Sequence, residues 1–146
     1  MRKPWIAALV LAAAALPAAA QSFAKAEDAV AYRQGAFRMI GVHFGQLAGA
    51  AKGELQLSPA QVRANAEVLA YLSQLPFNAF TAQGDSRALP EVWSKPAEFQ
   101  AQADKFKAAT QALSVAAQSG NVAQIKAAVG QAGQTCKSCH DAFRKP

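Results

Sequence analysis

Residues 121–140 read NVAQIKAAVGQAGQTCKSCH, a stretch that sets both local structure and chemistry. Asn121 is a favourable N-cap residue. Val122, Ile125 and Val129 follow it at the three- and four-residue spacing that is typical of a helix. The stretch therefore predicts a helix that starts after Asn121 and carries a motif at its end.

That motif is Cys136-Lys137-Ser138-Cys139-His140, the C-x-x-C-H pattern by which haem is covalently attached in c-type cytochromes. Positions i, i+3 and i+4 of a helix share one face. Both thiols can therefore reach the two vinyl groups of one porphyrin while the imidazole faces its iron. A single cofactor would use all three side chains.

Two other interpretations of the motif stay open. A zinc site would need more ligands, and the chain has only one other His, His43, and no further Cys, so a carboxylate would have to be recruited. A redox dithiol of the thioredoxin kind is expected near a βαβ unit, and no strand pattern precedes the motif. Haem attachment is the interpretation that the residues favour.

The N-terminus has the pattern of an exported precursor. Two basic residues, Arg2 and Lys3, precede an apolar run over 5–16 and small residues at 18–20. The apolar run is too short to span a bilayer comfortably, which argues against a membrane anchor. We predict a cleaved signal peptide over residues 1–20, a periplasmic location and no membrane contact after cleavage.

The predicted mature chain, residues 21–146, has the length of a single domain. Its two Cys cannot build a disulfide framework, and thioether bonds to haem would remove both thiols from oxidation outside the cytoplasm. The full chain has 15 Lys and Arg against 9 Asp and Glu, a net charge of +6, and loss of Arg2 and Lys3 leaves 13 against 9, or +4. The basic residues are scattered, so we predict no nucleic-acid binding.

Four stretches of the mature chain show helical spacing of apolar residues, and none alternates with period two for long. We therefore predict an all-α fold with four helices. The first is expected over 25–50 and ends near Gly53. Its apolar stripe consists of Val30, Phe37, Ile40, Phe44 and Leu47.

The next two helices have clear boundary signals. The second starts with Ser58 as N-cap and Pro59 at the first helical position, and its apolar face stops at Pro76. The third starts near Pro96 and ends at Gly120. The third helix is expected to bury Phe99, Phe106, Leu113 and Val115.

Residues 75–95 form one long irregular connection, which we expect to cross the bundle or to cover an opening. Its three large aromatic residues, Phe77, Phe80 and Trp93, are expected to pack inward.

Gly41, Gly45 and Gly49 lie four residues apart on the first helix. This spacing permits a close crossing with a neighbouring helix or with a second subunit, and both alternatives stay open.

The predicted helices, the long connection and the C-x-x-C-H motif follow one another in an order that resembles the cytochromes c′ of the class II cytochrome c family. Members of that family attach haem close to the C-terminus. The resemblance covers essentially residues 21–146. It implies an up-down-up-down antiparallel four-helix bundle that holds one haem c, usually in a homodimer. The matching segments are 29–34 (AVAYRQ), 43–45 (HFG), 75–77 (LPF), 90–94 (PEVWS) and 136–144 (CKSCHDAFR).

The resemblance also implies roles for single residues. Cys136 and Cys139 would carry the thioether bonds, and His140 would be the proximal iron ligand. Arg33, with Gln34 beside it, would approach the haem propionates.

Arg144 lies one helical turn beyond His140, so the same resemblance places it beside the proximal face of the haem. There it would either act electrostatically on the iron and its ligands, or form a salt bridge to Asp141 or to a propionate.

The sixth iron position decides the function. In six-coordinate members of the family, the distal Met lies four residues after the Arg that is Arg33 here, and that position is Phe37. Met39, the only Met of the mature chain, is displaced by roughly 200° around the helix from Phe37, and His43 by roughly 240°. We interpret Met39 as a core residue and His43 as partly exposed. Because Phe37 cannot coordinate iron, we predict a five-coordinate, high-spin haem.

An apolar, vacant distal side would admit carbon monoxide and nitric oxide in preference to anions or water. Two functions follow from it. One is a periplasmic redox protein that exchanges electrons with a partner protein the sequence does not identify; the other is a dedicated nitric oxide-binding protein. No paired carboxylates and no nucleophile with its base can be assigned beside the haem, so we predict no enzymatic turnover.

Overall fold

The computed structural model describes residues 22–146. The predicted signal peptide, residues 1–20, lies outside this range. Four long helices make up the fold, as the sequence predicted, and two short helical turns lie between the second and the third of them. The elements are α1 (Ala26–Lys52), α2 (Pro59–Leu72), η1 (Pro76–Ala79), α3 (Glu91–Ser94), α4 (Pro96–Ser119) and α5 (Val122–Phe143).

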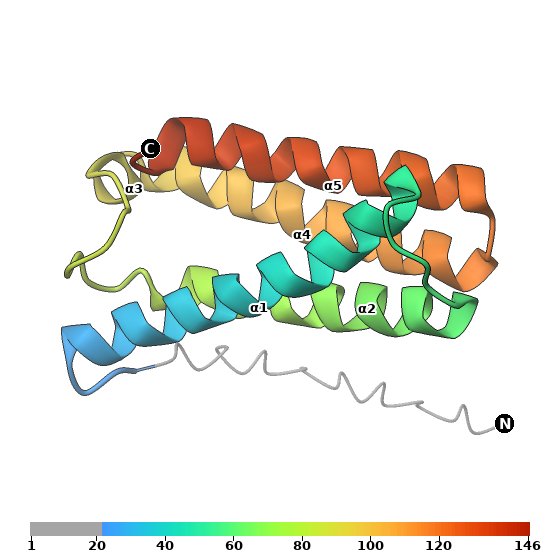
Figure 1. Ribbon diagram of the computed structural model, residues 1–146. Coiled ribbons are helices and arrows are strands. Elements are labelled where there is room, and N and C mark those ends of the chain that lie inside the picture. Colours follow the sequence, from blue (N-terminus) through green and yellow to red (C-terminus); the bar gives the residue numbers. More distant parts are fainter. Residues whose placement is uncertain (1–21) are drawn as a thin grey trace, which may run out of the picture.

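The long helices alternate in direction, so the up-down-up-down bundle is confirmed. Figure 1 shows α1 and α2 as one layer and α4 and α5 as the other. The start of α1, the end of α2, the start of α4 and the end of α5 meet at one end of the bundle. The N-terminal part of α1 and the C-terminal part of α5 therefore lie at the same end.

Local signals fix the helix ends. Ser58 Oγ accepts a hydrogen bond from the Gln61 N–H at 3.2 Å, and Gln61 Oε1 accepts one from the Ser58 N–H at 2.9 Å, which completes a capping box. Asn121 caps α5 through the Gln124 N–H at 3.1 Å. Gly120 ends α4 in the left-handed conformation at φ 69°.

The core follows the predicted stripes with two exceptions. Val30, Ile40 and Leu47 of α1 are buried and Phe37 and Phe44 are half-buried. The prediction for Val115 was wrong, because its side chain is 63 % exposed on α4. The prediction that Met39 is a core residue was also wrong, because its side chain is 47 % exposed on α1.

The connection from α2 to α4 crosses between the two layers at the end where α5 terminates (Figure 1). Its aromatic residues pack inward as predicted: Phe77 is buried, and Trp93 Nε1 donates to the Phe80 carbonyl at 3.0 Å. Gly84 has φ +61°, and a Cβ there would lie 2.5 Å from Val30 Cγ2. Only glycine fits this turn against α1 without displacing a neighbour.

Gly41, Gly45 and Gly49 of α1 do not form a close helix crossing within residues 22–146. A Cβ at Gly41 or Gly45 would meet nothing within 4 Å, and one at Gly49 would meet only Leu55 Cβ, at 3.4 Å. A close approach is found instead on α5, where a Cβ at Gly133 would lie 3.3 Å from the Phe44 ring. The prediction that these glycines cross closely with a neighbouring helix is therefore wrong. A close crossing with a second subunit stays a prediction.

None of the helices in residues 22–146 has the length and apolar character that crossing a membrane requires.

Candidate functional site

A cavity of about 660 Å³ opens between α1 and α5, beside the connection from α2 to α4. This volume is in the range of small-molecule and cofactor sites. The structure brings all seven predicted site residues to its walls: Arg33, Gln34, Phe37, Cys136, Cys139, His140 and Arg144. Their individual roles stay predictions.

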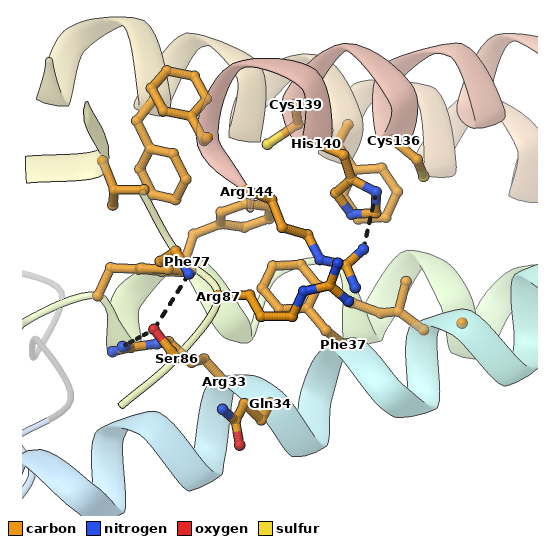
Figure 2. Close-up of a pocket in the computed structure, with 18 of the residues that line it drawn as sticks. Arg33, Gln34, Phe37, Phe77, Ser86, Arg87, Cys136, Cys139, His140 and Arg144 are labelled. Carbon is orange, nitrogen blue, oxygen red and sulfur yellow. Dashed lines mark hydrogen bonds between the residues drawn. The ribbon is translucent and has the colours of Figure 1, made fainter. Parts of the chain in front are cut away.

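The motif occupies one wall. Cys136, Cys139 and His140 lie on neighbouring turns of α5 and face the cavity (Figure 2). Both cysteines are free thiols. Burial raises the pKa of Cys136, and burial together with the neighbouring Cys136 raises the pKa of Cys139 to about 11. The thiols are therefore protonated at neutral pH, unlike the low-pKa cysteine of a reactive dithiol.

His140 is surrounded by positive charge. Its pKa is lowered by partial burial first, then by Arg144 and by Arg87, while Asp141 opposes the shift. The imidazole is therefore neutral at pH 7, which is the form that binds a metal ion. Within residues 22–146, no group of three or more His, Cys, Asp or Glu is placed to hold a metal ion, which leaves the zinc alternative without a ligand set.

Arg144 turns back toward His140, with its Nη1 atom 3.4 Å from His140 Nδ1. Among the described residues Asp141 pairs with Lys137 and not with Arg144, so the salt bridge to Asp141 is not formed, while a salt bridge to a propionate and an electrostatic role stay predictions. Arg87 also lines the cavity beside these residues (Figure 2). The sequence pattern did not single out Arg87, since it lies 53 residues before His140 in an irregular segment.

The wall opposite the motif is apolar and comes from α1 and the connection. The Phe37 ring contacts Phe77 edge-on at 5.7 Å and Phe80 at 6.3 Å between centroids. Phe99 and Phe106 of α4 extend this cluster. Such a surface offers no hydrogen-bond donor to a ligand.

Met39 and His43 do not line the cavity. His43 is half-buried, and its Nδ1 lies 2.7 Å from Asn65 Oδ1, between α1 and α2. Because Asn65 Nδ2 donates to the Gln61 carbonyl, its Oδ1 accepts the hydrogen of His43 Nδ1. Both residues therefore lie off the Phe37 stripe, as the helical spacing predicts.

Arg33 is 2 % exposed and is bound to backbone. Its guanidinium donates to the carbonyls of Ala79 at 2.9 Å, of Ala82 at 2.8 Å and of Gln83. It also donates to the Ser86 hydroxyl. It also stacks 4.7 Å from the centroid of the Phe80 ring. Burial lowers the Arg33 pKa, but a guanidinium stays charged. These acceptors could not be predicted, because they lie 46 to 53 residues away along the chain.

The cavity wall is positively charged. Four arginines line it (Arg33, Arg38, Arg87 and Arg144), and no Asp or Glu does. The described ion pairs all use lysines instead. An apolar interior, cationic side chains, two neutral thiols and a neutral imidazole match a flat apolar macrocycle that carries anionic groups, so the residues present fit a haem.

The chain matches the family model described as Cytochrome C' over residues 28–144. It is similar to cytochrome c' of Alcaligenes xylosoxydans xylosoxydans, with 45% identity over 84% of this chain and 98% of the relative. It is also similar to cytochrome c' of Rubrivivax gelatinosus, with 44% identity over 84% of this chain and 98% of that relative.

Solved structures show the same similarity. The crystal structure of the Rubrivivax gelatinosus protein matches with a TM-score of 0.82 over 85% of this chain and 100% of its own, at 44% identity. A nitric oxide complex of a variant cytochrome c prime from Alcaligenes xylosoxidans matches with a TM-score of 0.81 over 86% of this chain and 99% of its own, at 43% identity.

Proposed function

This chain belongs to the cytochrome c′ family, and on that premise we propose that it is a periplasmic c-type haem protein with a five-coordinate, high-spin haem that transfers electrons and binds nitric oxide and carbon monoxide. One observation carries the proposal. Two thiols and an imidazole from α5 face the same cavity whose opposite wall is Phe37, a side chain that cannot bind iron.

Each wall of the cavity has a part in this function. Cys136 and Cys139 would form the thioether bonds, and His140 would bind the iron from the α5 side. Bound haem supplies an iron that exchanges one electron and has an axial position for a gas. Phe37, Phe77 and Phe80 keep that side apolar, so a polar or anionic ligand would lose hydration without gaining a hydrogen bond.

The cavity arginines would receive the propionates. Arg38, Arg87 and Arg144 have exposed side chains at the wall and no carboxylate partner in the described residues. The Arg33 guanidinium is held by backbone carbonyls. A propionate bound by Arg33, as the resemblance implies, would have to share the guanidinium with these carbonyls.

We expect protein made in a host that attaches haem c to keep its colour in acidified acetone, because thioether bonds do not dissociate there. The ferrous protein should show a high-spin spectrum that changes on addition of carbon monoxide. Cys136→Ser with Cys139→Ser should lose the retained colour, whereas Ser138→Ala, between the two cysteines, should keep it. A low-spin spectrum that the gas leaves unchanged would contradict the open sixth position.

A second candidate function is a dedicated nitric oxide-binding protein with little electron transfer. It is favoured by the nitric oxide complexes of similar proteins and by the lack of a hydrogen-bonding group on the Phe37 wall. Deletion of the gene distinguishes the two functions. Reduced electron flux supports the carrier, and increased sensitivity to nitric oxide supports the binding protein. Neither function requires enzymatic turnover.

We also propose that the protein forms a homodimer through α1 and α2. Met39 and Val42 on α1 and Val68 and Tyr71 on α2 are exposed apolar side chains on adjacent helices, and Gly41 and Gly45 leave room for a second backbone. Val42→Lys should shift the sedimentation coefficient to that of a monomer at micromolar concentration, because a buried ammonium is costly. Val115→Lys, on α4, is the matched control and should leave the dimer intact; a wild-type monomer would contradict the proposal.

A further inference from the structure

The C-terminus is paired with the connection that precedes α3. The Leu89 N–H donates to the Phe143 carbonyl at 2.9 Å, and the Lys145 N–H donates to the Arg87 carbonyl at 2.8 Å. Between them, Ala88 and Arg144 form an antiparallel bridge, the only β-bridge in residues 22–146. Residues 143–145 therefore have a fixed partner in a segment more than 50 residues earlier.

The Arg87 side chain adds a third bond to this pairing. Its Nη2 donates to the Lys145 carbonyl at 2.9 Å, so Arg87 contacts Lys145 through its backbone carbonyl and its guanidinium. The guanidinium is exposed and has no carboxylate partner among the described residues. Its polar contact is with the backbone of the C-terminal segment.

The segment that carries Arg87 is held at its other end by Arg33. The Arg33 guanidinium binds the carbonyls of Ala79, Ala82 and Gln83 and the Ser86 hydroxyl, directly before Arg87. The connection is thus fixed to α1 and then to the C-terminus. A free loop could not hold the end of the chain in place.

Arg144 is the residue that this pairing holds. It has left the helix, with φ −133° and ψ 135°, and both of its neighbours are hydrogen-bonded to the connection. Its guanidinium returns to His140 Nδ1 at 3.4 Å, and Arg87 lines the same cavity (Figure 2). Without the pairing, the hydrogen bond that the Arg144 N–H donates to the His140 carbonyl at 3.1 Å would still tie its backbone to α5, but the segment after α5 would no longer be held against the connection, and the long Arg144 side chain would sample more orientations.

We propose that Arg87 is a positioning residue, which pairs with Lys145 and thereby holds the Arg144 guanidinium beside the imidazole of His140. The proposal rests on the proposed function, since the environment of His140 matters to the haem only if His140 is its ligand. A guanidinium held 3.4 Å from the His140 ring disfavours the ferric haem, which is more positive than the ferrous haem. The pairing therefore raises the reduction potential.

The first test measures the pairing itself, by amide hydrogen exchange of Leu89 and Lys145 in the haem-loaded protein. Arg87→Ala should speed exchange at Lys145 by roughly fivefold, the effect of one hydrogen bond lost from a small pairing. Arg87→Lys, which can still donate, should restore part of the protection. Lys126→Ala removes an exposed charge elsewhere on α5 and should change nothing. Unchanged exchange in Arg87→Ala would overturn the proposal.

The second test separates positioning from the charge of Arg87 itself. Arg87→Ala and Arg144→Ala should each lower the reduction potential, and the shift of the double variant should be smaller than the sum of the two, because Arg87 acts on the site both through its own charge and through the position of Arg144. Additive shifts would mean that Arg87 acts only through its own charge, and no shift in Arg87→Ala would mean that Arg144 does not depend on it. Either result overturns the proposal. A protein without attached haem would instead contradict the proposed function, while the exchange test would still decide the pairing.

A third pair of variants leaves both arginines in place. Lys145→Pro removes the N–H that donates to Arg87, and the extended backbone of Arg144 suits a residue before proline. Lys145→Gln removes the charge but keeps the N–H. Lys145→Pro should lower the potential in the direction of Arg144→Ala, and Lys145→Gln should not. Equal potentials for the two variants would overturn the proposal.

Discussion

Arg33→Met is expected to destabilise the protein by about 3 kcal/mol or more, since hydrogen bonds to a charged group contribute ~1.5–3 kcal/mol each. Arg33 is 2 % exposed, and its guanidinium donates to three carbonyls of the connection. Methionine fills much of the volume but leaves those carbonyls without a donor. It also removes the stacking of the guanidinium on Phe80.

Urea unfolding followed by circular dichroism measures this effect, with the midpoint and the slope reported separately. Arg38→Met is the matched control, because Arg38 lies on the same helix and lines the same cavity but is exposed and has no polar partner within residues 22–146. It should change stability by less than about 0.5 kcal/mol. Arg33→Lys should recover only part of the loss, since one ammonium cannot replace the planar fork of donors.

The same experiment distinguishes the two roles of Arg33. If Arg33 acts mainly on a haem propionate, as resemblance implies, Arg33→Met should shift the reduction potential and leave the unfolding midpoint nearly unchanged. If its main role is to hold the connection, as the contacts indicate, the midpoint should fall. A stable Arg33→Met protein would therefore contradict the structural role.

The helices could be predicted because their signals are local. The capping box of Ser58 and Gln61, the prolines that open α2 and α4, and the glycine that closes α4 each act within one turn. The two errors of burial, Met39 and Val115, are apolar residues that the structure leaves on the surface. Hydrophobicity alone does not assign a residue to the core.

The motif residues of the site could be predicted for the same reason, because i, i+3 and i+4 on one helix converge whatever surrounds them. The partners of Arg33, the fit of Gly84 against Val30 and the pairing of Arg87 with Lys145 could not be predicted. All three join segments that are more than 45 residues apart, and the two arginine contacts are with backbone carbonyls, which carry no mark in the sequence.

Phe37→Met is expected to change the iron from five- to six-coordinate, with a low-spin spectrum in place of a high-spin one. Phe37 lines the wall opposite His140, and a methionine there has a flexible thioether that can reach across an apolar cavity. Carbon monoxide must then displace the sulfur. If the thioether occupies the site about 99 % of the time, the apparent affinity for the gas falls roughly 100-fold.

Optical spectra of the ferric and ferrous forms and a carbon monoxide titration measure this result. Phe44→Met is the matched control: it makes the same substitution on the same helix and in the same cavity, but about 10 Å further along the axis, and it should keep the high-spin spectrum. Met39→Leu should also leave the spectrum unchanged, because Met39 lies outside the cavity. A folded Phe37→Met protein that remains high-spin and binds the gas as before would count against the position of α1 over the iron, and with it against the five-coordinate haem.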